Sequence, residues 1–326
     1  MKIAVLLPCY NEEKTIEKVV RDFRRVLPEA YIYVYDNNSS DKSVPIVEEI
    51  IKEDEKVFLR HERRQGKGNV VRSMFRDVEA DCYIINDSDD TYPAEHAREM
   101  ADLVLNDGVD MVIGDRLSST YFEENKRPFH NFGNVLVRKL INSIFKVDFL
   151  DIMTGYRAMS NTFVKSFPIL SEGFEIETEM SIHCADKKFE YKEVPINYRD
   201  RPEDSYSKLN TYSDGFKVIR TIFRLYRHYK PFMFFGIWSL INFIIAGIAF
   251  IPIFSEYLKT GLVPRIPTLI VVGVVVVVGV ILFFVGLMLD SIDKKSRQNY
   301  EVSLNYYISM MDKLKKEKDD EGEEDK

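Results

Sequence analysis

Short apolar runs alternate with longer segments of helical periodicity through the first 115 residues. Apolar runs predict strands, and segments with apolar residues three and four positions apart predict helices. The expected strands cover 3–8, 31–36, 57–61, 82–87 and 111–116, and the expected helices cover 12–27, 43–54, 68–78 and 93–107. Strands that alternate with helices in this way form right-handed βαβ units around a mostly parallel sheet. The pattern therefore predicts an α/β domain.

Polar clusters follow all five expected strands. They occupy residues 8–13, 36–41, 63–69, 86–93 and 114–119. Ligands of such sheets bind beyond the carboxyl ends of the strands, so these clusters predict a site along one rim. Their spread over five strand ends favours a polar ligand of nucleotide size.

The pattern becomes mixed between residues 116 and 228. Helices are expected near 129–145 and 174–188, a strand at 190–198 and a long loop at 199–214. Segment 214–229 then divides into an apolar stripe and a basic stripe. We expect this segment to lie in a lipid interface, although a surface helix packed on the domain has the same pattern.

Two late segments, 231–254 and 267–289, contain no charged residue. Each is long enough to cross about 30 Å of hydrocarbon as a helix, which favours a membrane hairpin over two buried helices of a soluble domain. Basic residues flank the pair on its outer sides, namely Arg220, Arg224, Arg227, Lys230, Lys294, Lys295 and Arg297. The positive-inside tendency therefore predicts that both termini are cytoplasmic. The N-terminus reads as a strand and lacks the pattern of a signal peptide.

These patterns predict five parts of the chain. They are a globular domain at 1–212, an interfacial helix at 213–230, membrane spans at 231–254 and 267–289, and a cytoplasmic segment at 290–326. The last part begins as a helix and ends in the charged run 316–326, which we expect to be disordered.

Composition narrows the function classes. The formal charge of -7 argues against a general nucleic-acid binder. Cys9, Cys82 and Cys184 lie far apart and predict reduced thiols, with neither a disulfide framework nor a zinc site. The rim lacks the spacing of a phosphate-binding P-loop, and no dinucleotide-binding glycine motif follows the first strand.

Lys67 stands between Gly66 and Gly68. Glycines permit unusual backbone conformations, so this lysine can approach a phosphate closely. The same glycines are equally consistent with a turn that opens a helix.

Three carboxylates, Asp87, Asp89 and Asp90, crowd the end of the fourth expected strand. A solvated acidic turn is one interpretation. The other is an Asp-x-Asp pair, Asp87 and Asp89, that binds a hard divalent cation together with substrate phosphates. Asp90 is expected to point the other way and to cap the helix that begins near Pro93.

Seven motifs in this order and spacing resemble the family 2 glycosyltransferases. They are LLPCYNEE, DNNSSD, GKGNVVRSMF, NDSDDTYP, GDR, TGYRAMS and RPEDSYSKL. Within that family they look like the polyprenyl-phosphate glycosyltransferases, which include dolichyl-phosphate mannose synthases and bacterial undecaprenyl-phosphate sugar transferases. The resemblance covers roughly residues 1–230. It implies a GT-A domain, Rossmann-like with a mostly parallel sheet, followed by an amphipathic helix and a two-helix transmembrane hairpin.

The resemblance also implies roles for matching residues. Nucleotide-sugar contacts are implied for Pro8, Tyr10, Glu12, Asp36, Lys67 and Asp87. Asp89, with Asp87 beside it, is implied to bind Mg²⁺ or Mn²⁺. Catalytic roles are implied for Asp89, Arg116, Arg201 and Lys208. Asp204 stands where many relatives have glycine, so the loop that carries Arg201 departs from the family pattern.

The acceptor is argued from its chemistry. A phosphate monoester has a second pKa of about 6 and is already largely ionised at neutral pH. It therefore needs cations that position it more than it needs a general base. Candidate groups for it are Arg116, Arg127, Arg157, Arg201 and Ser207, and for each arginine a surface or salt-bridge role stays open. A hydroxyl acceptor would need a general base, for which the candidates are Glu175, Glu177 and Glu179. Glu175 and Glu179 share a helix face and are equally placed to pair with arginines.

The expected reaction is inverting transfer of a hexose from UDP-glucose or UDP-N-acetylglucosamine to a polyprenyl phosphate on the cytoplasmic face of the membrane. A dolichyl-phosphate mannose synthase that uses GDP-mannose is an alternative. A processive polysaccharide synthase is disfavoured because the single tryptophan, Trp238, lies inside the first span and not in a Gln-x-x-Arg-Trp motif. A non-catalytic scaffold is disfavoured by the presence of Asp89 and Lys67. The resemblance also implies a homo-oligomer, with tetramers among the relatives.

Overall fold

The computed structural model describes residues 1–118, 128–173, 175–199, 223 and 227–324. The chain divides into two compact units, Met1–Thr211 and Tyr212–Lys326, each described by itself. The first unit contains the sheet and the second contains two long helices.

The first unit is built on one seven-stranded sheet with the order β3-β2-β1-β4-β6-β5-β7. Its strands are β1 (Ile3–Cys9), β2 (Tyr31–Asp36), β3 (Val57–His61), β4 (Cys82–Ile85), β5 (Met111–Asp115), β6 (Arg157–Ser160) and β7 (Tyr191–Pro195). Neighbouring strands are parallel except at β6, which runs antiparallel to both β4 and β5. The predicted mostly parallel sheet is confirmed, and the carboxyl ends of β1 to β5 meet at one edge. Because β6 is reversed, it begins at this same edge.

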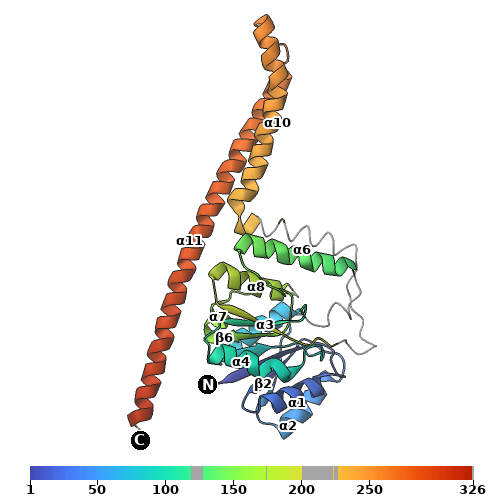
Figure 1. Ribbon diagram of the computed structural model, residues 1–326, viewed down its shortest axis with the longest axis vertical. Coiled ribbons are helices and arrows are strands. Elements are labelled where there is room, and N and C mark those ends of the chain that lie inside the picture. Colours follow the sequence, from blue (N-terminus) through green and yellow to red (C-terminus); the bar gives the residue numbers. More distant parts are fainter. Residues whose placement is uncertain (119–127, 174, 200–222, 224–226, 325–326) are drawn as a thin grey trace. The chain divides into compact units, whose positions relative to one another are not determined.

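Helices cover both faces of the sheet (Figure 1). They are α1 (Ile16–Val26), α2 (Ser43–Glu53), α3 (Lys67–Asp77), the 3-10 turn η1 (Ala94–His96), α4 (Ala97–Leu105), α6 (Pro128–Phe145), α7 (Asn161–Ser166) and α8 (Ile176–Lys187). Val5 and Leu7 of β1 share a core with Phe23 of α1 and Met100 of α4. Helices α3 and α7 contact β1 and β4, respectively, and each other. The near-continuous apolar strands follow from this burial on both faces.

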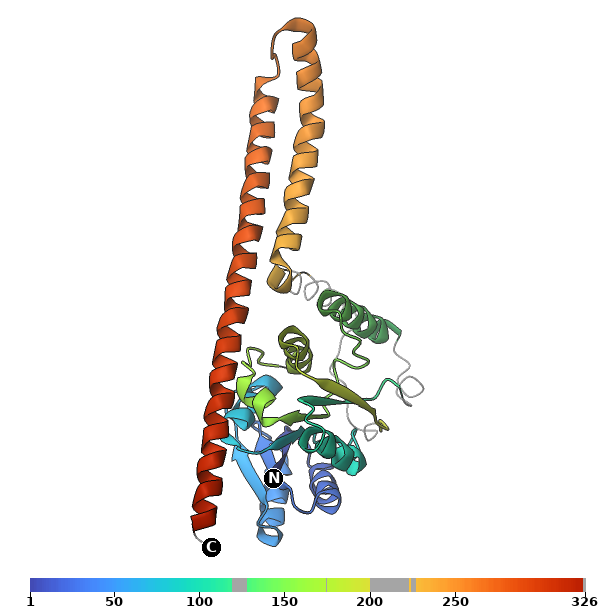
Figure 2. The same ribbon diagram turned by 60° about the vertical axis from the view of Figure 1, so that its left-hand side comes forward.

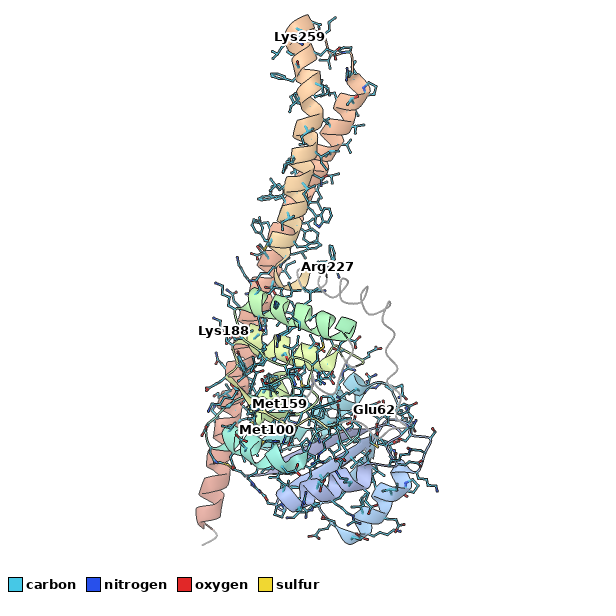
Figure 3. The ribbon with its side chains drawn as sticks, turned by 45° about the vertical axis from the view of Figure 1, so that its right-hand side comes forward. Glu62, Met100, Met159, Lys188, Arg227 and Lys259 are labelled. Atoms are coloured by element: carbon cyan, nitrogen blue, oxygen red, sulfur yellow. The ribbon has the colours of Figure 1, made fainter. Side chains whose placement is uncertain are left out.

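The second unit contains an antiparallel helical hairpin (Figure 2). Helix α10 spans Pro231–Thr260 and α11 spans Ile266–Glu324, and both are long and apolar enough to cross a membrane. Gly261 ends α10 in the left-handed conformation with φ 69°. Apolar side chains project along both helices between Arg227 before α10 and Lys259 near its end (Figure 3).

Helix α11 extends well beyond its apolar segment. The charged run expected to be disordered is helical as far as Glu324, because α11 continues past the apolar segment without a proline or a glycine between residues 287 and 321. Ion pairs one turn apart, Lys294 with Asp290 and Arg297 with Asp293, support the helix beyond that segment. The expected interfacial helix at 213–230 lies mostly outside the described residues.

The two hairpin helices approach closely at glycines of α11. Ser239 Oγ donates a hydrogen bond to the carbonyl oxygen of Gly279 at 2.7 Å. A Cβ atom built on Gly286 would lie 3.0 Å from Phe235 Cβ. Small residues at such crossings let the helix backbones approach, and they drive association where the hydrophobic effect is absent.

We predict that Gly286→Leu destabilises the hairpin by about 1–3 kcal/mol, because the new side chain collides with Phe235 and forces the helices apart. Thermal unfolding of the full chain in detergent measures the effect. Gly273→Leu is the matched control, since a Cβ there meets nothing within 4 Å in the described chain. Equal melting temperatures for the two variants would contradict the proposed packing.

Candidate active site

The carboxyl edge of the sheet gathers the polar clusters that the sequence places after each strand. Registers between neighbouring strands align Cys9 with Asp36 and Asp36 with His61. On the other side of β1, Leu6 aligns with Ile85, so Asp87 follows β4 at the same edge. The predicted single rim is therefore present.

Asp36, at the end of β2, is buried and organises the turn that follows. Its carboxylate accepts backbone N–H groups from Asn38 at 3.2 Å and Ser39 at 3.1 Å. His61 Nδ1 lies 3.3 Å from Asp36 Oδ2. Tyr10, after β1, is 44% exposed at this edge. The Asp36 carboxylate and the His61 imidazole are therefore neighbours, and Tyr10 follows the strand residue, Cys9, that is aligned with Asp36.

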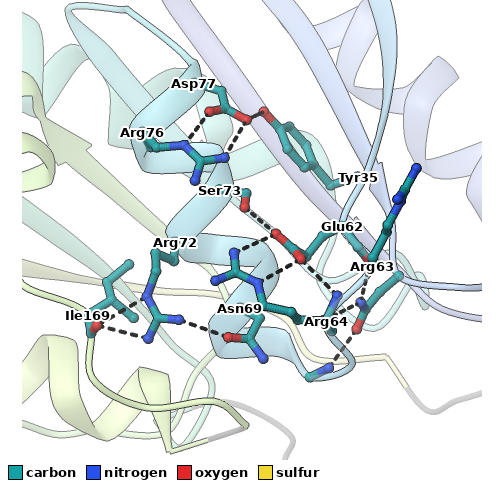
Figure 4. A network of polar contacts seen from close by, with 12 residues as sticks. Tyr35, Glu62, Arg63, Arg64, Asn69, Arg72, Ser73, Arg76, Asp77 and Ile169 are labelled. Atoms are coloured by element: carbon teal, nitrogen blue, oxygen red, sulfur yellow. Dashed lines mark hydrogen bonds and ion pairs between the residues drawn. The ribbon is translucent and has the colours of Figure 1, made fainter.

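The loop after β3 is fixed by a polar network around Glu62 (Figure 4). The Arg64 guanidinium pairs with Glu62 at 2.9 Å and 3.0 Å, and Ser73 Oγ donates to the same carboxylate. These contacts lower the pKa of Glu62 to about 2, and the Arg64 hydrogen bond is the largest cause. Asn37 accepts the Gly66 N–H at 2.8 Å and ties β2 to this loop.

The glycines around Lys67 make room for another part of the chain. Gly66 has φ 124°, and a Cβ on either Gly66 or Gly68 would collide with the backbone at Ser171 and Glu172. Gly68 N–H donates to the carbonyl oxygen of Glu172 at 3.0 Å. Gly66 holds the N-cap position of α3, so the glycines open a helix, and they also admit the segment before α8.

Lys67 itself is buried between two carboxylates. Its Nζ lies 2.5 Å from Asp87 Oδ1 and 2.6 Å from Glu177 Oε1. Burial lowers the pKa of Lys67, but the two carboxylates outweigh burial and raise it overall. Burial raises the pKa of Glu177, an effect that Lys67 opposes. The side chain of Asp87 is 25% exposed, so it reaches the rim while the other two lie beneath it.

Asp87 is enclosed on its other side by the segment before β6. A Cβ on Gly155 would collide with the Asp87 carboxylate. Gly155 N–H donates to Tyr92 OH at 3.2 Å, and Arg116 donates to the same oxygen at 3.1 Å. Arg116 also donates to Asp151 Oδ2 at 2.8 Å. The predicted Arg116 therefore lies in one polar network with Tyr92, close to Asp87.

Asp89 is buried at the end of β4 and shapes the turn. Its Oδ1 accepts the Thr91 N–H at 3.2 Å and the Thr91 hydroxyl at 2.6 Å. Between the two acids, Ser88 Oγ donates to the Pro8 carbonyl oxygen at 2.8 Å. Glu12 lies next to this turn, because Thr15 Oγ1 donates to Ser88 O at 2.7 Å and approaches Glu12 Oε2 at 3.3 Å.

The chain is similar in sequence to a known protein family. Residues 4–167, half of the chain, match the family model described as glycosyl transferase family 2. The chain belongs to this family. It is therefore a glycosyltransferase.

Several curated relatives come from Haloferax volcanii, and two of them are similar over most of the chain. The glycosyltransferase AglJ is 32% identical over 235 residues, which cover 72% of this chain and 75% of the relative. A dolichyl-phosphate hexose transferase is 28% identical over 223 residues, covering 68% and 93% of the two chains.

A solved structure shares the fold. Glucosyl-3-phosphoglycerate synthase from Mycobacterium tuberculosis, in complex with Mn²⁺, UDP and glucosyl-3-phosphoglycerate, superposes with a TM-score of 0.51 at 20% identity. The match covers 69% of this chain and 78% of that chain. The fold of the glycosyltransferase is the predicted GT-A fold.

Two residue predictions for the glycosyltransferase are corrected. Arg157 does not reach the rim: it is fully buried in β6 and donates to the carbonyl oxygens of Ile152 and Thr154 and to Ser181 Oγ. Burial lowers the pKa of Arg157. An acceptor phosphate cannot contact a guanidinium in the core, so Arg157 is removed from the candidates.

Asp90 does not cap the helix near Pro93, because Pro93 itself holds the N-cap position of η1 and receives no side-chain capping hydrogen bond. Asp90 has a left-handed φ of 60°. Its carboxylate pairs with Lys18 at 2.5 Å and Arg199 at 3.3 Å instead.

Two of the three candidate bases at the start of α8 have other partners. Glu177 pairs with Lys67, and Glu179 accepts the backbone N–H groups of Leu170 at 3.0 Å and Ser171 at 2.9 Å. Glu175 precedes α8 at its N-cap position without a side-chain capping hydrogen bond. The remaining candidates Arg127, Arg201, Ser207 and Lys208, together with Asp204, lie outside the described residues.

Sequence reasoning missed three residues of the network, Tyr92, Asp151 and Gly155. Tyr92 and Gly155 stand inside the motifs NDSDDTYP and TGYRAMS, so their signal was present without a role attached. Asp151 has no such signal, because its contact with Arg116 bridges 35 positions of sequence.

We predict that Gly155→Ala strongly weakens activity, because the added methyl group displaces the Asp87 carboxylate. Turnover with saturating substrates and donor binding measured by calorimetry test this, with at least about tenfold weaker binding expected for a shifted site group. Gly173→Ala is the control, since its Cβ would meet only the flexible end of Glu175. Unchanged donor binding by Gly155→Ala would contradict the role of this contact.

The low pKa of Glu62 predicts a pH dependence of stability. A carboxyl whose folded-state pKa lies below its unfolded-state value stabilises the fold above the unfolded value, and this stabilisation is lost as pH falls through the folded value. For Glu62 the window runs from about 4.5 down to about 2. Because the partner Arg64 is half exposed, we expect about 1–2 kcal/mol rather than the full effect of the shift.

Glu62→Gln should therefore lower the melting temperature at neutral pH by about 2–8 °C and lose this difference from the wild type at acidic pH. Circular dichroism over a pH series measures both. Glu49→Gln, at an exposed pair with Lys52, serves as the control. A difference that stays constant across the window would show that the carboxylate charge is not the cause.

Proposed function

We propose that this glycosyltransferase transfers a hexose from UDP-glucose or UDP-N-acetylglucosamine to a polyprenyl phosphate, with inversion at the anomeric carbon and release of UDP. The observation that carries the proposal is the pair Asp87 and Asp89 at the carboxyl edge of a GT-A sheet, in a chain that also has two helices able to span a membrane. Membership of family 2 and the likeness to a dolichyl-phosphate hexose transferase support it.

Asp89 and Asp87 fit a divalent cation by their chemistry. Both offer carboxylate oxygens, the ligands that Mg²⁺ and Mn²⁺ prefer. Within the described ranges no three potential metal-ligating side chains cluster, so donor phosphates and water would complete the coordination. When bound, the ion neutralises charge on the leaving diphosphate. The Mn²⁺ and UDP in the synthase of similar fold support this assignment.

The chain's own residues would bind and orient the substrates. Asp36 and Tyr10 would contact the nucleoside, and Asp87 the donor sugar nucleotide. Arg116, held by Asp151 and Tyr92, would sit beside the donor diphosphate or the acceptor phosphate as a fixed cation. The acceptor phosphate is already ionised, so no side chain has to remove a proton from it.

A hydroxyl acceptor is less well supported. Such an acceptor needs a base, and two of the three candidate glutamates, Glu177 and Glu179, accept hydrogen bonds from Lys67 and from the backbone before α8.

Both termini are proposed to face the cytoplasm because basic residues flank the hairpin on its outer sides. GDP-mannose remains the alternative donor, and an assay with a panel of nucleotide sugars decides between GDP-mannose and the UDP sugars.

The test incubates the purified full chain in detergent with UDP-glucose, UDP-N-acetylglucosamine or GDP-mannose and a short polyprenyl phosphate, with and without EDTA. Mass spectrometry identifies the lipid product. A polyprenyl-phosphate hexose that forms from a UDP sugar and disappears with EDTA is the expected result. Transfer to soluble sugars in place of the lipid phosphate would refute the acceptor assignment.

We predict that Asp89→Asn lowers transfer about 100-fold or more, because one metal-binding carboxylate is lost while the amide oxygen still accepts from Thr91. Asp90→Asn removes the same charge one residue away, where the carboxylate pairs with Lys18 on the surface, and should keep most activity. Full transfer by Asp89→Asn with metal present would refute the assignment.

A further inference from the structure

Lys67, Asp87 and Glu177 come from three different elements and form one ion cluster. Lys67 is the first residue of α3, Asp87 follows β4, and Glu177 lies in the first turn of α8. The ammonium lies 2.5 Å from Asp87 and 2.6 Å from Glu177, so both carboxylates share it. Less than a tenth of the Lys67 and Glu177 side chains is exposed, whereas a quarter of Asp87 is. Of the three side chains, Asp87 is therefore the one that reaches the carboxyl edge of the sheet.

The single ammonium of this cluster serves two carboxylates. The buried Arg157 guanidinium adds a positive charge that interacts electrostatically with Glu177. Burying a carboxylate is unfavourable unless it is paired, so both acids depend on these cations. The charge of Lys67 is therefore divided between Asp87 and Glu177.

We propose that Glu177 is a positioning residue that shares the Lys67 ammonium with Asp87, so that Asp87 keeps enough negative charge to bind a divalent cation together with the donor. This inference rests on the proposed function. Without Glu177, the ammonium would pair with Asp87 alone, and it would both neutralise that carboxylate and repel a second cation. Glu177 therefore acts on the donor site through Lys67 without touching the substrate.

A purely structural role for Glu177 makes a different prediction. In that case Glu177 only ties α8 to α3, and replacing it would lower stability without changing cation binding. Glu179 provides the matched comparison, because it lies on the same helix and fixes the segment before it through the N–H groups of Leu170 and Ser171.

The experiment titrates Mn²⁺ into the full chain in detergent and follows bound ion by electron paramagnetic resonance. UDP is held at a saturating concentration, and no acceptor is present. We expect Glu177→Gln to raise the apparent Mn²⁺ dissociation constant by about tenfold, as is typical when a partner of a metal ligand is lost. Glu179→Gln should leave the constant within about twofold of the wild type, even where it lowers the melting temperature.

The double variant Lys67→Met with Glu177→Gln tests the mechanism directly. It removes the ammonium that would neutralise Asp87, so we expect Mn²⁺ binding to return to within about threefold of the wild type. It also removes the buried cation, so it decides the question if Glu177→Gln alone does not fold. An unchanged constant in Glu177→Gln, or weak binding in the double variant, would overturn the role of Glu177.

Failure of the proposed function gives a distinct result. If the wild type with UDP binds no Mn²⁺, the donor site itself is wrong and the role of Glu177 falls with it. If the wild type binds Mn²⁺ and Glu177→Gln binds it equally well, only the inference about Glu177 is lost.

Discussion

The ammonium of Lys67 lies between two carboxylates that belong to different parts of the domain. One of them, Asp87, follows a central strand, and the other, Glu177, begins a helix 90 residues later. A buried lysine requires such partners, since an unpaired charge in the interior is strongly unfavourable. The pairing therefore fixes the start of α3, the end of β4 and the first turn of α8 to one point. This ion pair holds Asp87, the first acid after β4, in place.

The backbone around that point is arranged to let segments approach closely. Gly66 and Gly68 admit the carbonyl groups of Ser171 and Glu172, and Gly155 admits the carboxylate of Asp87. A side chain at Gly66 or Gly68 would move the segment before α8, and one at Gly155 would move the carboxylate of Asp87. Packing of this kind explains why the residues before α8 and before β6, distant in sequence, take part in the same edge of the sheet.

The rim could be predicted because its causes are local. Parallel strands present their carboxyl ends at one edge, so Asp36, Lys67, Asp87 and Arg116 had to meet there once the strands were identified. The directions of individual side chains could not be predicted in the same way. Arg157 lies within the motif TGYRAMS, yet it begins the antiparallel strand β6 and its guanidinium is buried in the core. Asp90 has a left-handed backbone and pairs with Lys18 and Arg199, and periodicity reveals neither.

The sequence by itself determined the alternation that builds the sheet, the two apolar helices and the acids at the strand end. Each of these is written in patterns of a few residues or in uninterrupted hydrophobicity. Only the tertiary structure decided which charges pair. Glu177 was one of three candidate bases, and in the structure it is the second partner of Lys67 across 110 positions of sequence. Contacts over such separations depend on how the helices dock on the sheet, and local patterns do not carry that information.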